Sequence, residues 1–68
     1  MENPVKQDRL ITLKEVSALT TLSKPTIYKR LKEGNFPKQI KVGRNRVAWS
    51  HREIFEWIAL QASMRPVG

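Results

Sequence analysis

The first constraint on the fold of this chain is that it contains no residues for disulfide or zinc cross-links. It has 68 residues with no cysteine and one histidine, so neither disulfides nor thiolate-bound zinc can brace it. We therefore expect no metal and no cofactor. A chain of this length buries only about 60% of the surface that it exposes when unfolded. The sequence predicts one small domain over residues 10–63, between a flexible N-terminal arm at 1–9 and a flexible tail at 64–68.

The apolar residues are too dispersed for a membrane segment. The longest uninterrupted apolar run is Trp57–Leu60, far below the roughly 20 residues that span a bilayer. The first ten residues contain no apolar stretch typical of a signal peptide. We therefore expect a soluble cytoplasmic protein.

The net charge of the chain is concentrated in one third of it. Thirteen Lys and Arg against six Asp and Glu give a net charge of +7, while the segments 1–23 and 47–68 are each neutral. The excess lies in a basic block, residues 24–46, opposed only by Glu33; its cations are Lys24, Lys29, Arg30, Lys32, Lys38, Lys41, Arg44 and Arg46. Such a block favours a polyanion partner. The alternative is a solvated surface that keeps the protein soluble.

Two short helices are predicted from their end signals. Thr12 and Glu15 form a capping box that opens a first helix ending near residues 20–21. Ser23 is a good N-cap for a second helix over residues 24–33, with Pro25 in its first turn. Gly34 ends that helix. Its apolar stripe consists of Ile27 and Leu31 alone, so most of the helix surface is expected to be exposed.

A β-hairpin and a third helix follow. Apolar residues alternate with polar ones around a turn at Gly43-Arg44-Asn45, which predicts a hairpin with an apolar inner face. That face would consist of Ile40, Val42, Val47 and Trp49. Ser50 and Glu53 form a second capping box, opening a helix with one apolar face. We expect the large aromatic residues to belong to the core: Phe36, Trp49, Phe55 and Trp57.

These elements, in this order, predict a winged helix-turn-helix, a mainly α fold with a small β-hairpin. The major groove of B-DNA admits one helix. The helix over residues 24–33 is suited to this role because a single apolar stripe anchors it and leaves its other surfaces exposed. The hairpin at 38–49 would be the wing, with its cations on the DNA backbone or in the minor groove.

Several short segments resemble one known family. Residues 16–28 (VSALTTLSKPTIY), 33–37 (EGNFP), 41–44 (KVGR) and 47–49 (VAW) are similar to the AlpA family of prophage regulators, relatives of phage excisionases and of MerR-like DNA-binding heads. The resemblance implies transcriptional control of prophage or genomic-island genes in the bacterial nucleoid. One position departs from the family pattern: the family usually has Gly where this chain has Thr21. A Thr at positive φ is strained, so we expect a differently built turn or a first helix that ends one residue later.

The expected DNA-binding residues lie on the second helix and the hairpin. They are Lys24, Pro25, Thr26, Tyr28, Lys29, Lys32, Lys38, Lys41, Arg44, Asn45 and Arg46. Thr26 and Lys29 are the expected base readers, whereas the hairpin cations would bind phosphates. Tyr28 could combine a packing role with a phosphate contact. Arg30 lies nearer the buried stripe, where it could instead pair with Glu33 or Glu15.

Other function classes remain as alternatives. An excisionase, an RNA-binding module and a protein-interaction module that inhibits another regulator are each compatible with a small basic domain. An enzyme is not expected, because the chain has no phosphate-binding loop, catalytic triad or paired carboxylates. The expected partner is double-stranded DNA, with integrase or other phage proteins as further candidates. Oligomeric state stays open, and one arrangement is a monomer binding cooperatively to repeated sites.

Overall fold

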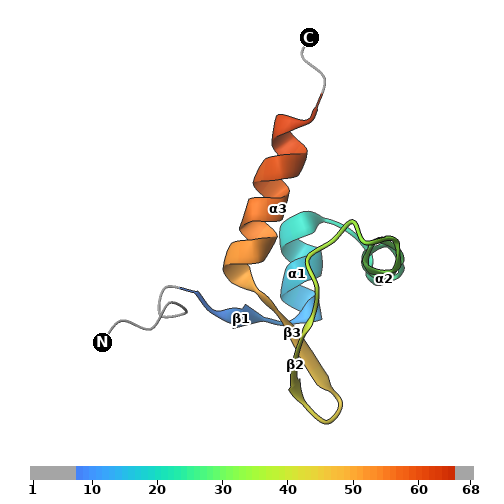
Figure 1. Ribbon diagram of the computed structural model, residues 1–68, viewed down its shortest axis with the longest axis vertical. Helices are drawn as coiled ribbons and strands as arrows, with labels where there is room; N and C mark the ends of the chain where they lie inside the picture. Colours follow the sequence, from blue (N-terminus) through green and yellow to red (C-terminus); the bar gives the residue numbers. More distant parts are fainter. Residues whose placement is uncertain (1–7, 66–68) are drawn as a thin grey trace.

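A computed structural model of the chain describes residues 8–65 and confirms the predicted fold class (Figure 1). The elements in chain order are β1 (Leu10–Ile11), α1 (Leu13–Thr20), α2 (Lys24–Glu33), β2 (Ile40–Gly43), β3 (Arg46–Ser50) and α3 (His51–Ser63). The strands form one antiparallel sheet in the order β1-β3-β2. Figure 1 shows α2 to one side of α1 and α3, and the β2–β3 hairpin projecting at the end opposite the last turn of α3.

The helix ends follow the predicted capping signals. The hydroxyls of Thr12, Ser23 and Ser50 accept hydrogen bonds from backbone N–H groups three residues on, at 3.2, 3.4 and 3.1 Å. Gly34 takes the left-handed conformation, with φ of 79°, at the end of α2. Each cap satisfies a donor or acceptor that the helix leaves open, so α1, α2 and α3 begin where the sequence predicts.

The core joins all three helices to the sheet. Its buried residues are Ile11, Val16, Ile27, Phe36, Trp49 and Ile54. Ile27 is fully buried and Leu31 packs beside it, which confirms the narrow stripe predicted for α2. None of the helices in the described range 8–65 is long and apolar enough to cross a membrane.

The hairpin does not have the predicted apolar inner face. Ile40 pairs with Ala48, and Lys41 pairs with Val47. Paired residues in an antiparallel ladder share a face, so Ile40 and Val47 lie on opposite faces. Ile40 and Val47 are exposed, whereas Ala48 and Trp49 are buried. The prediction was wrong because the strand register, and not the alternation alone, sets which side chains meet.

The role predicted for Phe55 was also wrong. Its side chain is 46% exposed and packs edge-on against the ring of His51, with the ring centroids 4.5 Å apart. Ile54, one residue earlier, occupies the fully buried position on α3. Since successive helical residues are about 100° apart, Phe55 lies at the border of the apolar face.

A short N-terminal strand was not predicted. β1 pairs with β3, with Leu10 opposite Ser50 and Ile11 opposite Trp49. The arm expected over residues 1–9 falls mostly outside the described residues, but its last two residues contact the start of α3. The Asp8 carboxylate accepts hydrogen bonds from the Ser50 hydroxyl and the Arg52 N–H, and the Arg9 carbonyl accepts one from the His51 N–H.

The turn between α1 and α2 contains the departure at Thr21. α1 ends at Thr20, and Thr21 itself takes the left-handed conformation, with φ of 62° and ψ of 12°. The expectation that a threonine would avoid this geometry was wrong. Local hydrogen bonds hold the turn, because the Ser17 hydroxyl donates to the Leu22 carbonyl at 2.6 Å and the Leu22 N–H donates to the Thr20 hydroxyl at 3.3 Å.

Candidate nucleic-acid interface

The exposed side of α2 carries the first group of predicted binding residues. Lys29 is two residues from Ile27 and therefore about 200° around the helix from the buried stripe. Lys29 and Lys32 are exposed, as is Pro25 in the first turn. A helix anchored on one side by Ile27 can present this opposite side to a groove without losing its core contacts.

Thr26 has a different setting from the lysines. Its side chain is half-buried, and its hydroxyl lies 2.9 Å from that of Ser23, whose oxygen also accepts from the Thr26 N–H. The Thr26 hydroxyl is thus part of the N-cap of α2. Thr26 can offer a methyl group to a partner, while its hydroxyl already has a hydrogen-bond partner.

Tyr28 connects α2 to the segment that enters the wing. Its side chain is 39% exposed, and its phenolic oxygen accepts a hydrogen bond from the Gln39 amide at 3.4 Å. Gln39 stands just before β2 and was not among the predicted site residues. Nothing in its sequence setting marked it, because the contact joins residues eleven positions apart.

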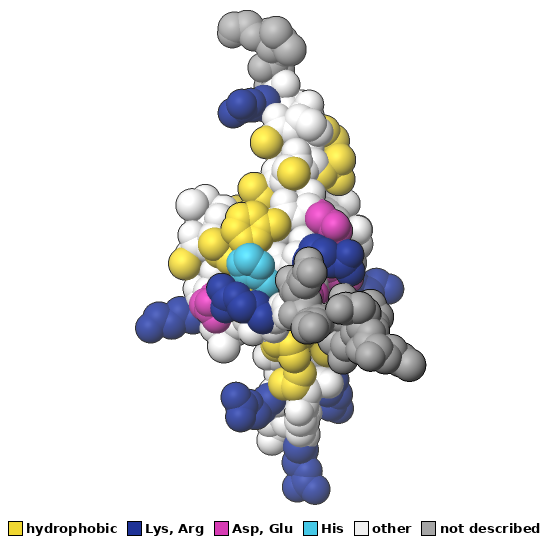
Figure 2. Space-filling view, turned by 90° about the vertical axis from the view of Figure 1, so that its left-hand side faces the viewer, with side chains coloured by type: hydrophobic (Ala, Val, Ile, Leu, Met, Phe, Trp, Pro, Cys, Tyr) yellow, Lys and Arg dark blue, Asp and Glu magenta, His cyan; other side chains and the backbone are white. Residues whose placement is uncertain are grey.

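The hairpin carries the second group of cations. Lys38 precedes β2 and Lys41 lies within it, while Arg44 and Asn45 form the turn and Arg46 begins β3. All five side chains are exposed. Figure 2 shows Lys and Arg side chains around this end of the molecule and at its tip, with no Asp or Glu beside them on the visible face.

The cations of the basic block are not neutralised within the described part of the chain. Among residues 8–65 the one ion pair is Arg9 with Glu15, at 3.4 Å, and neither residue belongs to the block. The positive charge of α2 and the hairpin is therefore available to an anionic partner. A concentrated, uncompensated charge of this kind raises the local concentration of polyanions and speeds their association.

Arg30 does not pair with either predicted carboxylate. Its guanidinium carbon lies 5.8 Å from the centroid of the Trp57 ring, within cation–π range. Glu15 is instead bonded to Arg9. The prediction failed because Trp57, 27 positions further along the chain, was assigned to the core and not considered as a neighbour of α2.

The described residues offer no set of metal ligands: within 8–65, no three His, Asp or Glu side chains gather at one place. The ring of His51 packs against Phe55. The chemistry available at this surface is that of ammonium, guanidinium, amide and hydroxyl donors. These are the groups that contact phosphates and base edges in protein–DNA complexes.

Comparisons with known proteins find one matching family and several similar sequences. Residues 9–62 match the family described as prophage CP4-57 regulatory protein (AlpA). The chain is 38% identical over 64 residues to the uncharacterized protein ORF88 of Enterobacteria phage P4, covering 94% of this chain and 73% of that protein. It is 37% identical over 57 residues to the response regulator inhibitor for tor operon of Escherichia coli strain K12 and to the probable excisionase hkaC of Shigella phage Sf6. Each match covers 84% of this chain and 85% of the relative.

Proposed function

The chain belongs to the AlpA family of prophage regulatory proteins, and from this we propose that it is a sequence-specific DNA-binding regulator of prophage or genomic-island genes. In this proposal α2 enters the major groove of duplex DNA and the β2–β3 hairpin acts as a wing. Bacterial nucleoid DNA is then its site of action, and integrase or other phage proteins are candidate further partners.

One observation carries the proposal: the lysines of α2 and the cations of the hairpin are exposed and have no carboxylate partner within residues 8–65. α2 and the hairpin project beyond the body formed by α1 and α3 in Figure 1. α2 is held through Ile27 and Leu31, so the opposite side, which carries Lys29 and Lys32, remains exposed. A helix and a ribbon of this kind match the two features of B-DNA that proteins read, the major groove and the backbone.

The proposed residues divide into two groups by their expected contacts. Lys29 lies opposite the buried stripe and would contact base edges, together with the methyl group of Thr26. The others would contact phosphates or the minor groove and fix the orientation of the protein: Lys24, Pro25, Tyr28, Lys32, Lys38, Lys41, Arg44, Asn45 and Arg46. Phosphate contacts supply affinity without reading sequence directly.

The names of the relatives favour two other uses of the same surface. The relative from Shigella phage Sf6 is named a probable excisionase, so the second candidate is an architectural factor that directs excisive recombination. The Escherichia coli relative is named a response regulator inhibitor, so a third candidate is a module that inhibits another regulator by contacting it. Both are compatible with DNA binding through α2 and the hairpin.

Binding selectivity and salt dependence test the DNA-binding step. Selection from a random duplex library should yield a preferred site, and that site should outcompete single-stranded DNA and structured RNA of equal length. If about four to six cations contact phosphates, the plot of log K against log salt concentration should have a slope of about −4 to −5. A slope shallower than about −2 would show that the basic block is not the interface.

Two alanine variants distinguish base reading from positioning. Lys29→Ala should weaken binding to the preferred site by about 1–3 kcal/mol and affect random duplex much less. Arg44→Ala should weaken both by similar factors and make the salt slope shallower by about one unit. If Arg44→Ala abolishes discrimination while Lys29→Ala lowers all affinities equally, the hairpin reads the sequence and α2 does not.

A reporter experiment distinguishes the regulator from the excisionase. A promoter containing the preferred site, fused to a reporter gene, should change its output when the protein is expressed. A plasmid carrying the attachment sites and the integrase should recombine equally with and without it. Recombination that depends on the protein, with an unchanged reporter, would favour the excisionase.

A further inference from the structure

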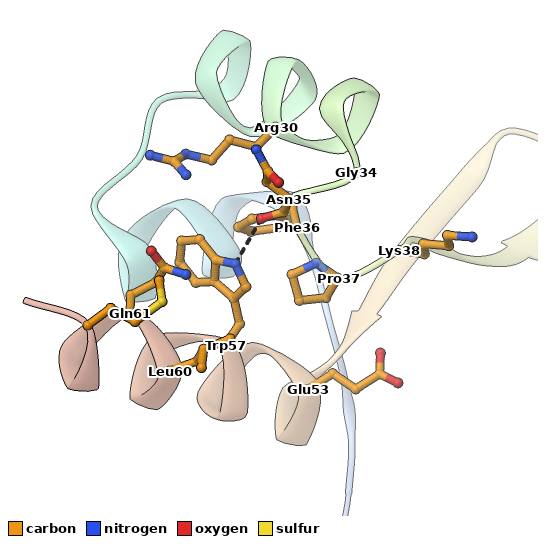
Figure 3. A pocket seen from close by; sticks show the side chains of 11 residues that line it. Arg30, Gly34, Asn35, Phe36, Pro37, Lys38, Glu53, Trp57, Leu60 and Gln61 are labelled. Atoms are coloured by element: carbon orange, nitrogen blue, oxygen red, sulfur yellow. Dashed lines mark hydrogen bonds between the residues drawn. The ribbon is translucent and has the colours of Figure 1, made fainter.

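An open cleft lies between the C-terminal end of α2 and the C-terminal half of α3, away from the proposed reading side of α2 (Figure 3). Its volume is about 870 Å³, and its lining includes Arg30, Phe36, Pro37, Trp57, Leu60 and Gln61. A volume of this size is typical of ligand-binding clefts in proteins. The lining combines apolar side chains with polar and charged ones.

The floor of the cleft is fixed by contacts within the protein. The indole N–H of Trp57 donates a hydrogen bond to the Asn35 carbonyl at 2.9 Å. The rings of Phe36 and Trp57 meet edge to face, with centroids 4.8 Å apart. The Trp57 ring is therefore held in one orientation, and its polar atom is already satisfied. A ligand would meet its apolar face.

Arg30 supplies an unused hydrogen-bond donor at this cleft. Its guanidinium lies over the Trp57 ring, and its Nε atom is buried without a hydrogen-bond partner in the described part of the chain. Figure 3 shows Arg30 and the Gln61 amide reaching toward the same edge of that ring. The buried Nε cannot be reached by a ligand, but the terminal guanidinium N–H groups donate no hydrogen bond to the described residues, and a carboxylate is the acceptor that a guanidinium binds best.

The charge and polarity of the cleft indicate what kind of ligand fits. Arg30 and Lys38 line it against the single carboxylate of Glu53, so the cleft is net positive. Leu60 and Met64, at one side, are 54% and 63% exposed and form an apolar rim. A second copy of the chain, with a net charge of +7, would be repelled from a positive cleft.

We propose that this cleft binds an acidic segment of a partner protein, in which a carboxylate adjoins an aliphatic or aromatic side chain. The carboxylate would accept from Arg30 and Gln61, and the apolar side chain would pack on Trp57 beside Leu60. Arg30 follows Lys29 directly and so lies about 100° around α2 from it. The proposed site therefore leaves Lys29 free and shares only Lys38 with the proposed DNA interface, so we expect the protein to hold DNA and the partner segment together.

A pair of matched peptides tests the proposal. The probe is acetyl-Glu-Leu-Leu-Phe-amide, and its control is acetyl-Gln-Leu-Leu-Phe-amide, which lacks the carboxylate. Titration of the full chain labelled with nitrogen-15 should shift the Trp57 indole N–H, Arg30 and Gln61 signals in a saturable way. The Glu peptide should bind at least fivefold more tightly than the Gln peptide. Arg30→Gln should remove that preference, whereas Lys29→Gln, on the DNA side, should retain it.

The remaining outcomes each contradict the proposal. Equal binding of the two peptides, or shifts that do not saturate, would show that Arg30 selects no carboxylate. Displacement of the peptide by duplex DNA would show that the cleft belongs to the DNA interface. A sedimentation coefficient that rises with protein concentration, and falls on adding the peptide, would show that a second copy occupies the cleft. The proposal would remain testable even if the Arg30→Gln variant did not fold, because the two peptides compare a carboxylate with an amide on the unchanged protein.

Discussion

Replacing Thr21 by glycine should stabilise this protein, although most substitutions destabilise one. Thr21 has φ of 62° and ψ of 12°, and in this region the Cβ of an L-residue crowds the backbone at a cost of about 1–2 kcal/mol. Glycine removes that crowding but loses about 0.5–1 kcal/mol more in backbone entropy on folding. The Thr21 N–H bond to the Ser17 carbonyl remains in the variant. The net gain should therefore be about 0.5–1 kcal/mol.

Thermal unfolding followed by circular dichroism measures this effect. For a domain of this size 1 kcal/mol corresponds to about 4–8 °C, so Thr21→Gly should raise Tm by about 2–8 °C. Ala18→Gly is the matched control, because Ala18 is an exposed position within α1. There glycine should cost about 1 kcal/mol and lower Tm.

A third variant separates the relief of backbone strain from the added flexibility of glycine. Thr21→Asn keeps a side chain but tolerates positive φ better than a β-branched residue, so it should also raise Tm. If Thr21→Gly instead lowers Tm as far as Ala18→Gly does, the turn carries no strain and the reasoning fails. DNA affinity should stay unchanged in all three variants, since none of them alters the exposed side of α2.

Two further predictions concern the start of α3, where the Ser50 hydroxyl accepts from the Glu53 N–H and donates to the Asp8 carboxylate. Ser50→Ala should lower the free energy of unfolding by about 1–2 kcal/mol in a urea titration and leave DNA affinity unchanged; lost binding at full stability would place Ser50 in the DNA interface. The Ser50 hydroxyl, followed by the Arg52 N–H, lowers the pKa of Asp8 below its usual value of 3.8. A lowered folded-state pKa gives stability that is present above about pH 4 and lost as the pH falls through the folded value. Tm should thus fall less steeply below pH 4 in Asp8→Asn than in the unchanged protein; equal slopes in the two proteins would refute the assignment.

The parts of the fold that the sequence predicts are those set by local chemistry. The bounds of α2 follow from Ser23, which caps its start, and Gly34, which takes the positive φ at its end. Both signals act within a few residues, so they can be recognised without knowledge of the tertiary structure. The same is true of Ser50 at the start of α3. The exposed lysines of α2 are predictable in the same way, because the narrow stripe on this helix leaves no place for them inside.

The predictions that failed concern contacts between residues that are far apart in the sequence. β1 has only two residues, too few for any alternation, and it exists because Ile11 can pair with Trp49. The exposed faces of the hairpin depend on the register that pairs Ile40 with Ala48. The sequence of one strand alone does not determine this register. Arg30 could be placed only once Trp57 was known to lie beside it. Charge and helical periodicity predicted the exposed lysines and the buried stripe of α2, but the sequence did not show which distant residues become neighbours.

The two tryptophans show how so small a core can hold α2 and the β2–β3 hairpin in a fixed relation. Both indole N–H groups donate to the loop that follows α2: Trp49 to the Pro37 carbonyl at 3.1 Å and Trp57 to the Asn35 carbonyl at 2.9 Å. Phe36, between these two carbonyls, is buried in the core. The loop is therefore held from β3 and from α3 at once, and it is the segment that joins α2 to β2. In a chain without disulfides, these contacts fix the direction in which the backbone leaves the proposed reading helix and enters the proposed wing.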